Sequence, residues 1–328
     1  MLLLIGPVVQ DDLVAILCRF RLHRYVFPAD VKKMYRQILI DDTDVDYQRI
    51  LWRKGPNDEL KSYQLLTVTY GTAPASFLAS RCLNQLVFEE GKEFPLAAEA
   101  ISDFYMDDCM SGGDELEIVR NKQMQLKSML RRAGFELHKW VVNDSSLLAE
   151  IQPQDRHLAD RQIDFDMPVK ALGLCWKPNQ DCFYYKVEPL NQSSRTKRTI
   201  LAEISKLFDP IGMLAPIIVE ARSIMRSLWL AKVNWDESPD DELLKRWFDY
   251  RTALTDLNDL RIDRWVEYSP KADIEFHGFC DASEQAYGAC IYRVKNANDS
   301  AVRIVWRGVV IRFDDENCNG NANSKRVH

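Results

Sequence analysis

The chain has 328 residues, of which 46% are hydrophobic and 28% are charged, and its formal net charge is -6. This length allows two or three domains with a sizeable core, and the composition excludes collagen-like, repeat and wholly disordered proteins. The net acidity argues against a wholly basic nucleic-acid binder, although a local basic groove is enough to track a phosphate backbone.

The apolar runs and the cysteines indicate where in the cell the protein is expected. The apolar start at residues 1–9 lacks the basic region of a signal peptide, and no apolar run approaches the length of a membrane span. Eight cysteines are scattered without a C-x-x-C pair. We therefore expect reduced thiols with no disulfide partner, no zinc module, no membrane partner and an intracellular location, in the cytoplasm, the nucleus or both.

Helix and strand periodicities alternate along the first hundred residues. Apolar residues at helical spacing precede an apolar strand that delivers Asp30 near its end. Pro74 stands where prolines favour the first turn of a helix. The predicted elements are a helix at 11–22, strands at 25–31 and 48–53, a turn at 55–58 leading to an apolar segment at 65–70, and a helix after residue 74.

The most informative stretch is a hairpin around Tyr105-Met106-Asp107-Asp108, closed by the flexible Ser111-Gly112-Gly113. Two adjacent carboxylates on an apolar hairpin resist joint ionisation, and a divalent cation relieves that repulsion. Successive strand residues point to opposite faces, so a metal site here needs a further acid from elsewhere. A solvated Asp-Asp turn is the alternative for the dipeptide alone.

The remaining elements follow from the same patterns. The helix predicted at 114–133 carries a basic run over residues 120–132, which either binds nucleic acid or is an ordinary solvated face. Gly134 stands at the position of a left-handed cap. The later elements are strands at 135–142 and 169–187, a helical stretch at 196–260 interrupted at 209–212, strands at 273–293 and 301–313, and a polar tail.

Taken in order, these motifs resemble the palm of a reverse transcriptase. The resemblance is closest to the BEL/Pao class of LTR retrotransposons and covers nearly the whole chain. The motifs that carry it are FPAD (27–30) with Tyr35, TYGTAP (69–74), YMDD (105–108), LRRAGFELHKW (130–140), LGLCW (172–176), KLFDPIGMLAP (206–216), NWDE (234–237) and FCDAS (279–283).

The resemblance implies an α+β fold with a right-hand polymerase palm, an antiparallel sheet with helices, from which most of the fingers are missing. A helical thumb or connection and a truncated RNase H-like strand set would follow. The expected boundaries are 1–24 for a remnant of the fingers, 25–190 for the palm with its primer-grip hairpin, 191–268 for the thumb or connection, 269–313 for the RNase H-like strands and 314–328 for a disordered tail.

The implied activity is RNA-directed DNA synthesis, in which two Mg²⁺ or Mn²⁺ ions promote transfer of a nucleotide to a primer 3′-hydroxyl. The implied partners are a template–primer and deoxynucleoside triphosphates. By similarity, Asp30, Asp107 and Asp108 are the catalytic and metal-binding acids. The implied nucleotide-binding residues are Tyr35, Val68, Tyr70, Gly71 and Lys139, and the implied primer-grip residues are Leu172, Gly173 and Trp176.

Several of these positions have a plainer interpretation. Tyr35, which would exclude a ribose 2′-hydroxyl, is otherwise a core aromatic, and Lys139 is otherwise an exposed strand lysine. Val68 occupies a position where many relatives have a polar residue. Asp281 resembles the first metal-binding acid of an RNase H domain, yet it has no predicted acidic partner; the alternative is a strand-end cap.

The competing functions are a polymerase core, a truncated non-catalytic remnant that at most binds nucleic acid, and a host protein that uses the fold as a scaffold. Because most of the fingers are missing, we expect weak polymerase activity. Peptidase chemistry, which this class carries as a label, is rejected: neither Asp-Thr-Gly nor Asp-Ser-Gly occurs, and Asp209-Pro210-Ile211-Gly212 is predicted to be a turn.

Overall fold

The computed structural model describes residues 3–157, 169–188, 195–270, 273–283, 286–295 and 302–311. The chain divides into two compact units, one formed by residues 1–186 and 259–274 and the other by residues 187–258 and 275–328. The predicted disordered tail at 314–328 lies outside the described residues. The α+β class is confirmed, because helices and antiparallel sheets occur in both units.

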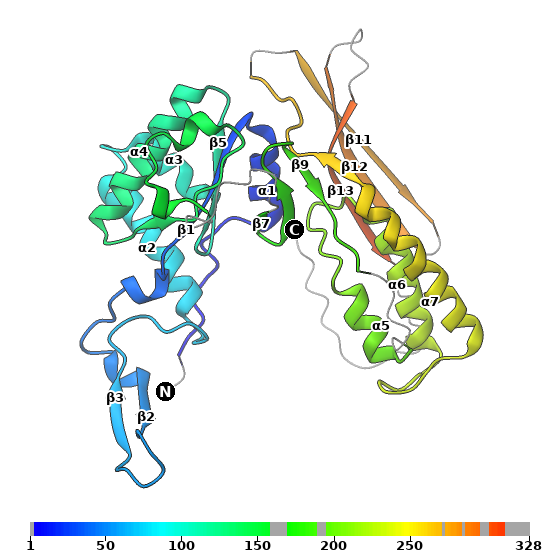
Figure 1. The fold of residues 1–328 in the computed structure, drawn as a ribbon, viewed down its shortest axis with the longest axis horizontal. Coiled ribbons are helices and arrows are strands. Elements are labelled where there is room, and N and C mark those ends of the chain that lie inside the picture. The colour runs from blue at the N-terminus through cyan, green and yellow to red at the C-terminus, as the bar shows by residue number, and fades with distance from the viewer. Residues whose placement is uncertain are drawn as a thin grey trace. The chain divides into compact units, whose positions relative to one another are not determined.

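The first unit is built on a four-stranded antiparallel sheet in the order β4-β5-β1-β6 (Figure 1). Helices α2, α3 and α4 pack together beside it, while α1 contacts β5. The elements are α1 (Leu13–Leu22), β1 (Tyr25–Val31), α2 (Ala75–Glu90), α3 (Pro95–Ala100), β4 (Phe104–Tyr105), β5 (Asp108–Gly113), α4 (Leu116–Arg132) and β6 (Leu137–His138).

The core of this sheet follows from the strand period. Phe27, Ala29 and Val31 alternate along β1 and are buried with Leu83 of α2 and Leu126 of α4. Neighbouring side chains on the other face of β1 are buried as well, so that β1 is a central strand covered on both faces. The strand that carries Asp30 is therefore the most rigidly held part of the unit.

Two smaller sheets complete the first unit. An exposed ribbon pairs β2 (Arg49–Trp52) with β3 (Lys61–Gln64). The other sheet has the antiparallel order β10-β9-β8-β7, built from β7 (Val169–Ala171), β8 (Leu174–Lys177), β9 (Cys182–Tyr184) and β10 (Arg261–Asp263). Short 3₁₀ turns lie at Met34–Gln37, Val45–Gln48, Ile101–Asp103, Ser145–Leu148 and Pro153–Asp155.

The second unit combines three helices with a three-stranded sheet of order β11-β12-β13. The helices bury Ile200, Leu228 and Trp247 among themselves, and α6 contacts β13. The elements are α5 (Lys197–Ile204), α6 (Ala215–Leu230), α7 (Asp241–Ala253), the 3₁₀ turn Leu254–Asp259, β11 (Ile274–Ala282), β12 (Ala286–Lys295) and β13 (Val302–Ile311).

The strand predicted over residues 135–142 is wrong in its extent, because only Leu137–His138 is a strand. Lys139 has a φ of 54°, in the left-handed region, which ends the extended backbone. The next residue, Trp140, donates its N–H to the carbonyl of Asp155 instead of continuing the sheet. The apolar sequence alone does not reveal this turn.

Residues 259–268 were assigned to the thumb or connection and residues 269–274 to the RNase H-like strands, yet both segments belong to the same compact unit as the β4-β5-β1-β6 sheet. The short strand β10 pairs with β9, and the neighbouring Arg264 is fully buried against α1 and the β8–β9 hairpin. The predicted domain boundaries themselves stay a prediction.

The turn predicted at Asp209-Pro210-Ile211-Gly212 is present. Gly212 has a φ of 74°, and a Cβ there would lie 1.8 Å from the carbonyl oxygen of Arg307, so only glycine fits. The carboxylate of Asp209 accepts hydrogen bonds from the N–H groups of Met213 (2.8 Å) and Leu214 (2.7 Å) just before α6. The carboxylate of Asp209 therefore closes the turn that leads into α6.

Candidate active site

The Met106-Asp107 turn is the tip of a two-residue hairpin loop, because Tyr105 pairs with Asp108 directly across it. Met106 has a φ of 57°, a left-handed conformation that costs a side-chain-bearing residue about 1 kcal/mol. The carbonyl of Asp107 accepts a 2.8 Å hydrogen bond from the N–H of Val31, which ties the tip to the end of β1. A strained turn held in this way is typical of functional sites.

Asp30 lies between two neighbouring strands. Its Cα pairs with that of Asp108 on β5 and with that of His138 on β6. One carboxylate oxygen of Asp30 is 2.5 Å from His138 Nε2, and the other accepts a 2.9 Å hydrogen bond from Lys139 Nζ. The sheet therefore brings the predicted acids of β1 and of the hairpin to one edge, as the sequence spacing suggested.

The negative charge of Asp30 acts on the pKa values of both hairpin acids. Burial is the largest cause that raises the pKa of Asp107, and the charge of Asp30 raises it further. The pKa of Asp108 is raised to about 6, first by burial and then by the charges of Asp107 and Asp30. Lys139 lowers both pKa values but does not cancel the rise. This edge of the sheet is consequently a place that favours an added cation.

The acids fit a divalent metal in their chemistry, since carboxylate oxygens are the ligands that Mg²⁺ takes. Their arrangement is not a closed metal cage: in the described residues no three His, Cys, Asp or Glu side chains stand together as a ready set of ligands. Asp30 instead binds His138 and Lys139.

A cavity of about 750 Å³ opens beside Asp107. It contains two of the predicted nucleotide-binding residues, Tyr35 and Tyr70, whose ring centroids lie 6.4 Å apart. It also adds two cations that the sequence analysis missed, Lys33 and Arg36, the latter 5.8 Å from the Tyr70 ring. The pocket therefore joins a carboxylate, two aromatic rings and two positive charges.

The other predicted nucleotide-binding residues lie outside the lining of this cavity. Val68 is 1% exposed and belongs to the core, so its side chain does not face a ligand. Gly71 has a φ of 86° with open space where a Cβ would stand. Lys139 lies beside Asp30, to which its Nζ donates a hydrogen bond. Its neighbour His138 was missed, because only the pairing of β1 with β6 reveals its place.

The β7–β8 hairpin lies at the position expected for the primer grip, a role that stays a prediction, and its residues differ in exposure. Leu172 and Gly173 form the tip of the β7–β8 hairpin, both with positive φ, where the Ala171–Leu174 pair closes the loop. Trp176 is fully buried and packs edge-on against Phe20 with centroids 5.5 Å apart. The tip is free to meet a ligand, whereas Trp176 supports the hairpin from the core.

An ion pair between the fully buried Arg264 and the partly buried Asp181 joins the β8–β9 turn to the segment after β10. Both carboxylate oxygens of Asp181 accept 2.6 Å hydrogen bonds from the guanidinium of Arg264, and one also accepts from the Trp176 indole at 3.1 Å. Arg264 further donates to the carbonyls of Phe20, His23 and Arg24. The sequence alone does not indicate this pair, because its partners are 83 residues apart in the chain.

Asp281, in the second unit, has a different setting. It lies on β11, where it is exposed, and one of its oxygens accepts a 2.8 Å hydrogen bond from the N–H of Ala282. Among the described residues it joins no group of three potential metal ligands.

Residues 196–305 match the family described as the Pao retrotransposon-like RNaseH-like domain. The match confirms the BEL/Pao retrotransposon resemblance over these residues and does not reach the reverse-transcriptase motifs. The matched segment covers about a third of the chain and includes the helices α5–α7, the strands β11 and β12 and the start of β13. The acids Asp30, Asp107 and Asp108 lie outside it. A search of curated proteins finds no match.

The retrotransposon RNaseH-like match implies a nucleic-acid-processing family whose members bind nucleic acid and generally use divalent metals.

The cysteines of the described residues are free thiols, at positions 18, 82, 109, 175, 182, 280 and 290. No helix in the described ranges is long and apolar enough to cross a membrane.

Proposed function

We propose that this chain is the polymerase core of a BEL/Pao-type retrotransposon, an RNA-directed DNA polymerase that extends a primer on a template. The observation that carries the proposal is the edge where Asp30 pairs with Asp108 and Asp107 faces the 750 Å³ cavity. The pKa values of Asp107 and Asp108, raised by burial and mutual repulsion, support a cationic partner there.

The roles of the residues follow from where they lie. Two Mg²⁺ or Mn²⁺ ions, when bound, would stabilise the attacking and leaving oxygens of an in-line displacement. Asp30 and Asp107 would hold them, with Asp108 supporting from the first residue of β5. Lys33 and Arg36 line the cavity beside Asp107, where they would bind the triphosphate of an incoming deoxynucleotide. The Leu172-Gly173 tip would contact the primer strand.

Tyr35 would set the choice of sugar. It lines the cavity, is half-buried and packs on the core, so its ring occupies a fixed place in the cavity wall. A rigid ring beside the sugar position excludes the 2′-hydroxyl, which is the group that separates ribonucleotides from deoxynucleotides. The scattered cysteines, without a C-x-x-C pair, suit the proposed intracellular location, in the cytoplasm or nucleus.

Primer extension tests the proposal. We expect the purified chain to extend a DNA primer on an RNA template with deoxynucleotides and Mg²⁺ or Mn²⁺, and Asp30→Asn to abolish the extension. A folded wild-type chain that binds the template–primer but does not extend it with either metal would leave a nucleic-acid-binding protein and refute the polymerase.

The sugar gate has its own test. Tyr35→Val should raise incorporation of ribonucleotides relative to deoxynucleotides about tenfold, because removal of a ring contact is worth about 1 to 3 kcal/mol of discrimination. Tyr70→Val, which removes the other ring of the cavity, serves as the matched control. Equal effects of the two substitutions on sugar choice would remove Tyr35 from this role.

A further inference from the structure

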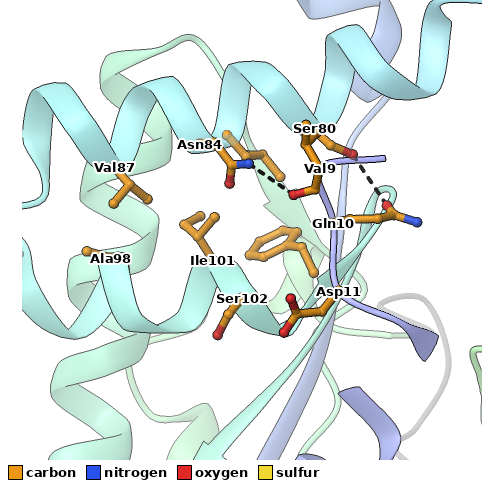
Figure 2. Close-up of a pocket in the computed structure, with 11 residues that line it drawn as sticks. Val9, Gln10, Asp11, Ser80, Asn84, Val87, Ala98, Ile101 and Ser102 are labelled. Carbon is orange, nitrogen blue, oxygen red and sulfur yellow. Dashed lines mark hydrogen bonds between the residues drawn. The ribbon is translucent and has the colours of Figure 1, made fainter. Parts of the chain in front are cut away.

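Residues 9–11 lie along α2 (Figure 2). Gln10 also contacts Met106, in the Met106-Asp107 turn. The carbonyl of Val9 accepts a 3.1 Å hydrogen bond from Asn84 Nδ2, and the side-chain oxygen of Gln10 accepts one of 3.3 Å from Ser80 Oγ. Asp11 forms a 2.8 Å ion pair with Arg19. This part of the chain is therefore anchored at three successive residues.

Gln10 also reaches the turn itself. Its Oε1 accepts a 3.2 Å hydrogen bond from the backbone N–H of Met106. The direction of this contact is fixed, because a backbone N–H can only donate, so the amide oxygen of Gln10 must face Met106. One oxygen thus joins α2, through Ser80, to the turn that carries Asp107.

We propose that Gln10 is a positioning residue for the Met106-Asp107 turn, a role that rests on the proposed polymerase function. Only two residue pairs, Phe104–Cys109 and Tyr105–Asp108, hold the hairpin by strand pairing. Met106 is in a strained left-handed conformation, and the adjacent carboxylates repel each other. The turn is held from one side by Val31 and from the other by Gln10.

Packing does not hold Gln10 in place by itself. The residue is half-buried and borders a cavity of about 380 Å³, whose wall also includes Ile101 and Phe104 (Figure 2). The hydrogen bonds to Ser80 and Met106 therefore determine where its amide lies. A leucine at this position has room to fit, so that Gln10→Leu removes the acceptor without forcing the fold apart.

Amide hydrogen exchange at Met106 reads this contact directly. In Gln10→Leu we expect the Met106 amide to exchange about tenfold faster, since a hydrogen bond of this kind is worth about 1 kcal/mol. Gln10→Glu retains the acceptor oxygen and should keep Met106 protected. Gln85→Leu, which removes a glutamine of α2 that binds Arg81 and Glu89, is the matched control and should leave Met106 unchanged.

Primer extension provides the second readout. A misplaced turn should lower kcat severalfold in Gln10→Leu while the KM for deoxynucleotide stays the same, because Lys33, Arg36 and Tyr35 are untouched. If wild type does not extend primers, the polymerase proposal fails, yet the exchange measurement still tests Gln10. If Met106 exchanges at the wild-type rate in Gln10→Leu while amides of α4 remain protected, the positioning role is overturned.

Discussion

Each of the two units has an acid near the end of a strand, Asp30 in the first and Asp281 in the second. The two acids differ in their exposure and in the charged groups around them. Asp30 faces Asp108 across one strand pair and His138 across another. Asp281 is exposed and accepts a hydrogen bond only from the adjacent residue, Ala282, among the interactions described. An acid at a strand end becomes a candidate site only when neighbouring strands bring further charges to it.

The difference has a structural origin. In the first unit β1 is central, covered on both faces, with a partner strand on each side. In the second unit β11 is the outermost strand of its three-stranded sheet, and its side chains are mostly exposed. Burial raises the pKa values of Asp107 and Asp108, and such desolvation is absent from an exposed strand.

A matched pair of variants tests this comparison most severely. Asp107→Asn should lower primer extension about 100- to 1,000-fold, the usual loss when one charged group is removed from a preorganised site. Asp281→Asn should leave extension within twofold of wild type. Single-turnover extension at saturating nucleotide measures both. A comparable loss in the two variants would show that Asp281 belongs to the same catalytic centre.

The second prediction concerns the ion pair between Arg264 and Asp181, at the β8–β9 turn. Arg264→Ala should lower the free energy of unfolding of the first unit by about 3 kcal/mol, because it leaves Asp181 partly buried without its partner. Arg53→Ala, at an exposed position beside the β2–β3 ribbon, should change it by less than about 0.5 kcal/mol. Chemical denaturation followed by tryptophan fluorescence, with Trp176 in the core, measures both.

A small loss in Arg264→Ala would contradict the view that this unit depends on buried polar contacts. The second unit provides a contrast: the buried Arg251 donates to Glu203 at 3.2 Å and to the Glu188 carbonyl at 2.7 Å, while its Nη1 has no hydrogen-bond partner among the described residues. Arg251→Ala should therefore cost less than Arg264→Ala. The reverse order would mean that hydrogen-bond number does not decide the strength of these pairs.

The sequence predicted what depends on local pattern. The strand at 25–31 has the bounds expected from its apolar run, and the helix after Pro74 begins at Ala75. The Asp107-Asp108 hairpin also lies where its sequence placed it. These elements are determined by neighbouring residues, so one sequence is enough to find them.

Features that depend on long-range pairing escaped prediction. His138 reaches Asp30 only through the register of β1 with β6, and Gln10 meets Met106 across 96 residues of chain. Strand β10 has three residues and no pattern of its own; it forms because β9 offers it an edge. Lys33 and Arg36 were overlooked beside Tyr35, although adjacent cations next to a predicted nucleotide-binding residue were a usable signal.

The third prediction follows from the pKa of Asp108. Folding raises this pKa from 3.8 to about 6, so the native state binds the proton more tightly than the unfolded chain does. The contribution to stability is therefore fully present below about pH 4 and is lost as the pH rises through about 6. Full burial would make it worth about 3 kcal/mol, and solvent screening at this half-buried group reduces it to about 1 kcal/mol.

Asp108→Asn should consequently be more stable than wild type by about 1 kcal/mol at pH 8, and the advantage should vanish near pH 4. Urea denaturation of both proteins at several pH values measures the difference. A variant that is less stable than wild type at pH 8 would show that the Asp108 carboxylate is stabilised in the folded state, opposite to the direction given by its burial and by Asp107 and Asp30.

The smallest effect is expected at Asp281. Hydrolysis of the RNA strand of an RNA–DNA hybrid by two metals needs several carboxylates around the scissile phosphate. In the described residues Asp281 joins no such group, and its strand is exposed. One carboxylate alone would leave the metals mostly hydrated and the phosphate unpositioned.

We therefore expect the chain to cleave a labelled hybrid at background rate in Mg²⁺, and Asp281→Asn to give the same trace. Cleavage by wild type that is lost in Asp281→Asn would mean that other acids complete the site, and the contrast between the two units would then be one of exposure and not of activity.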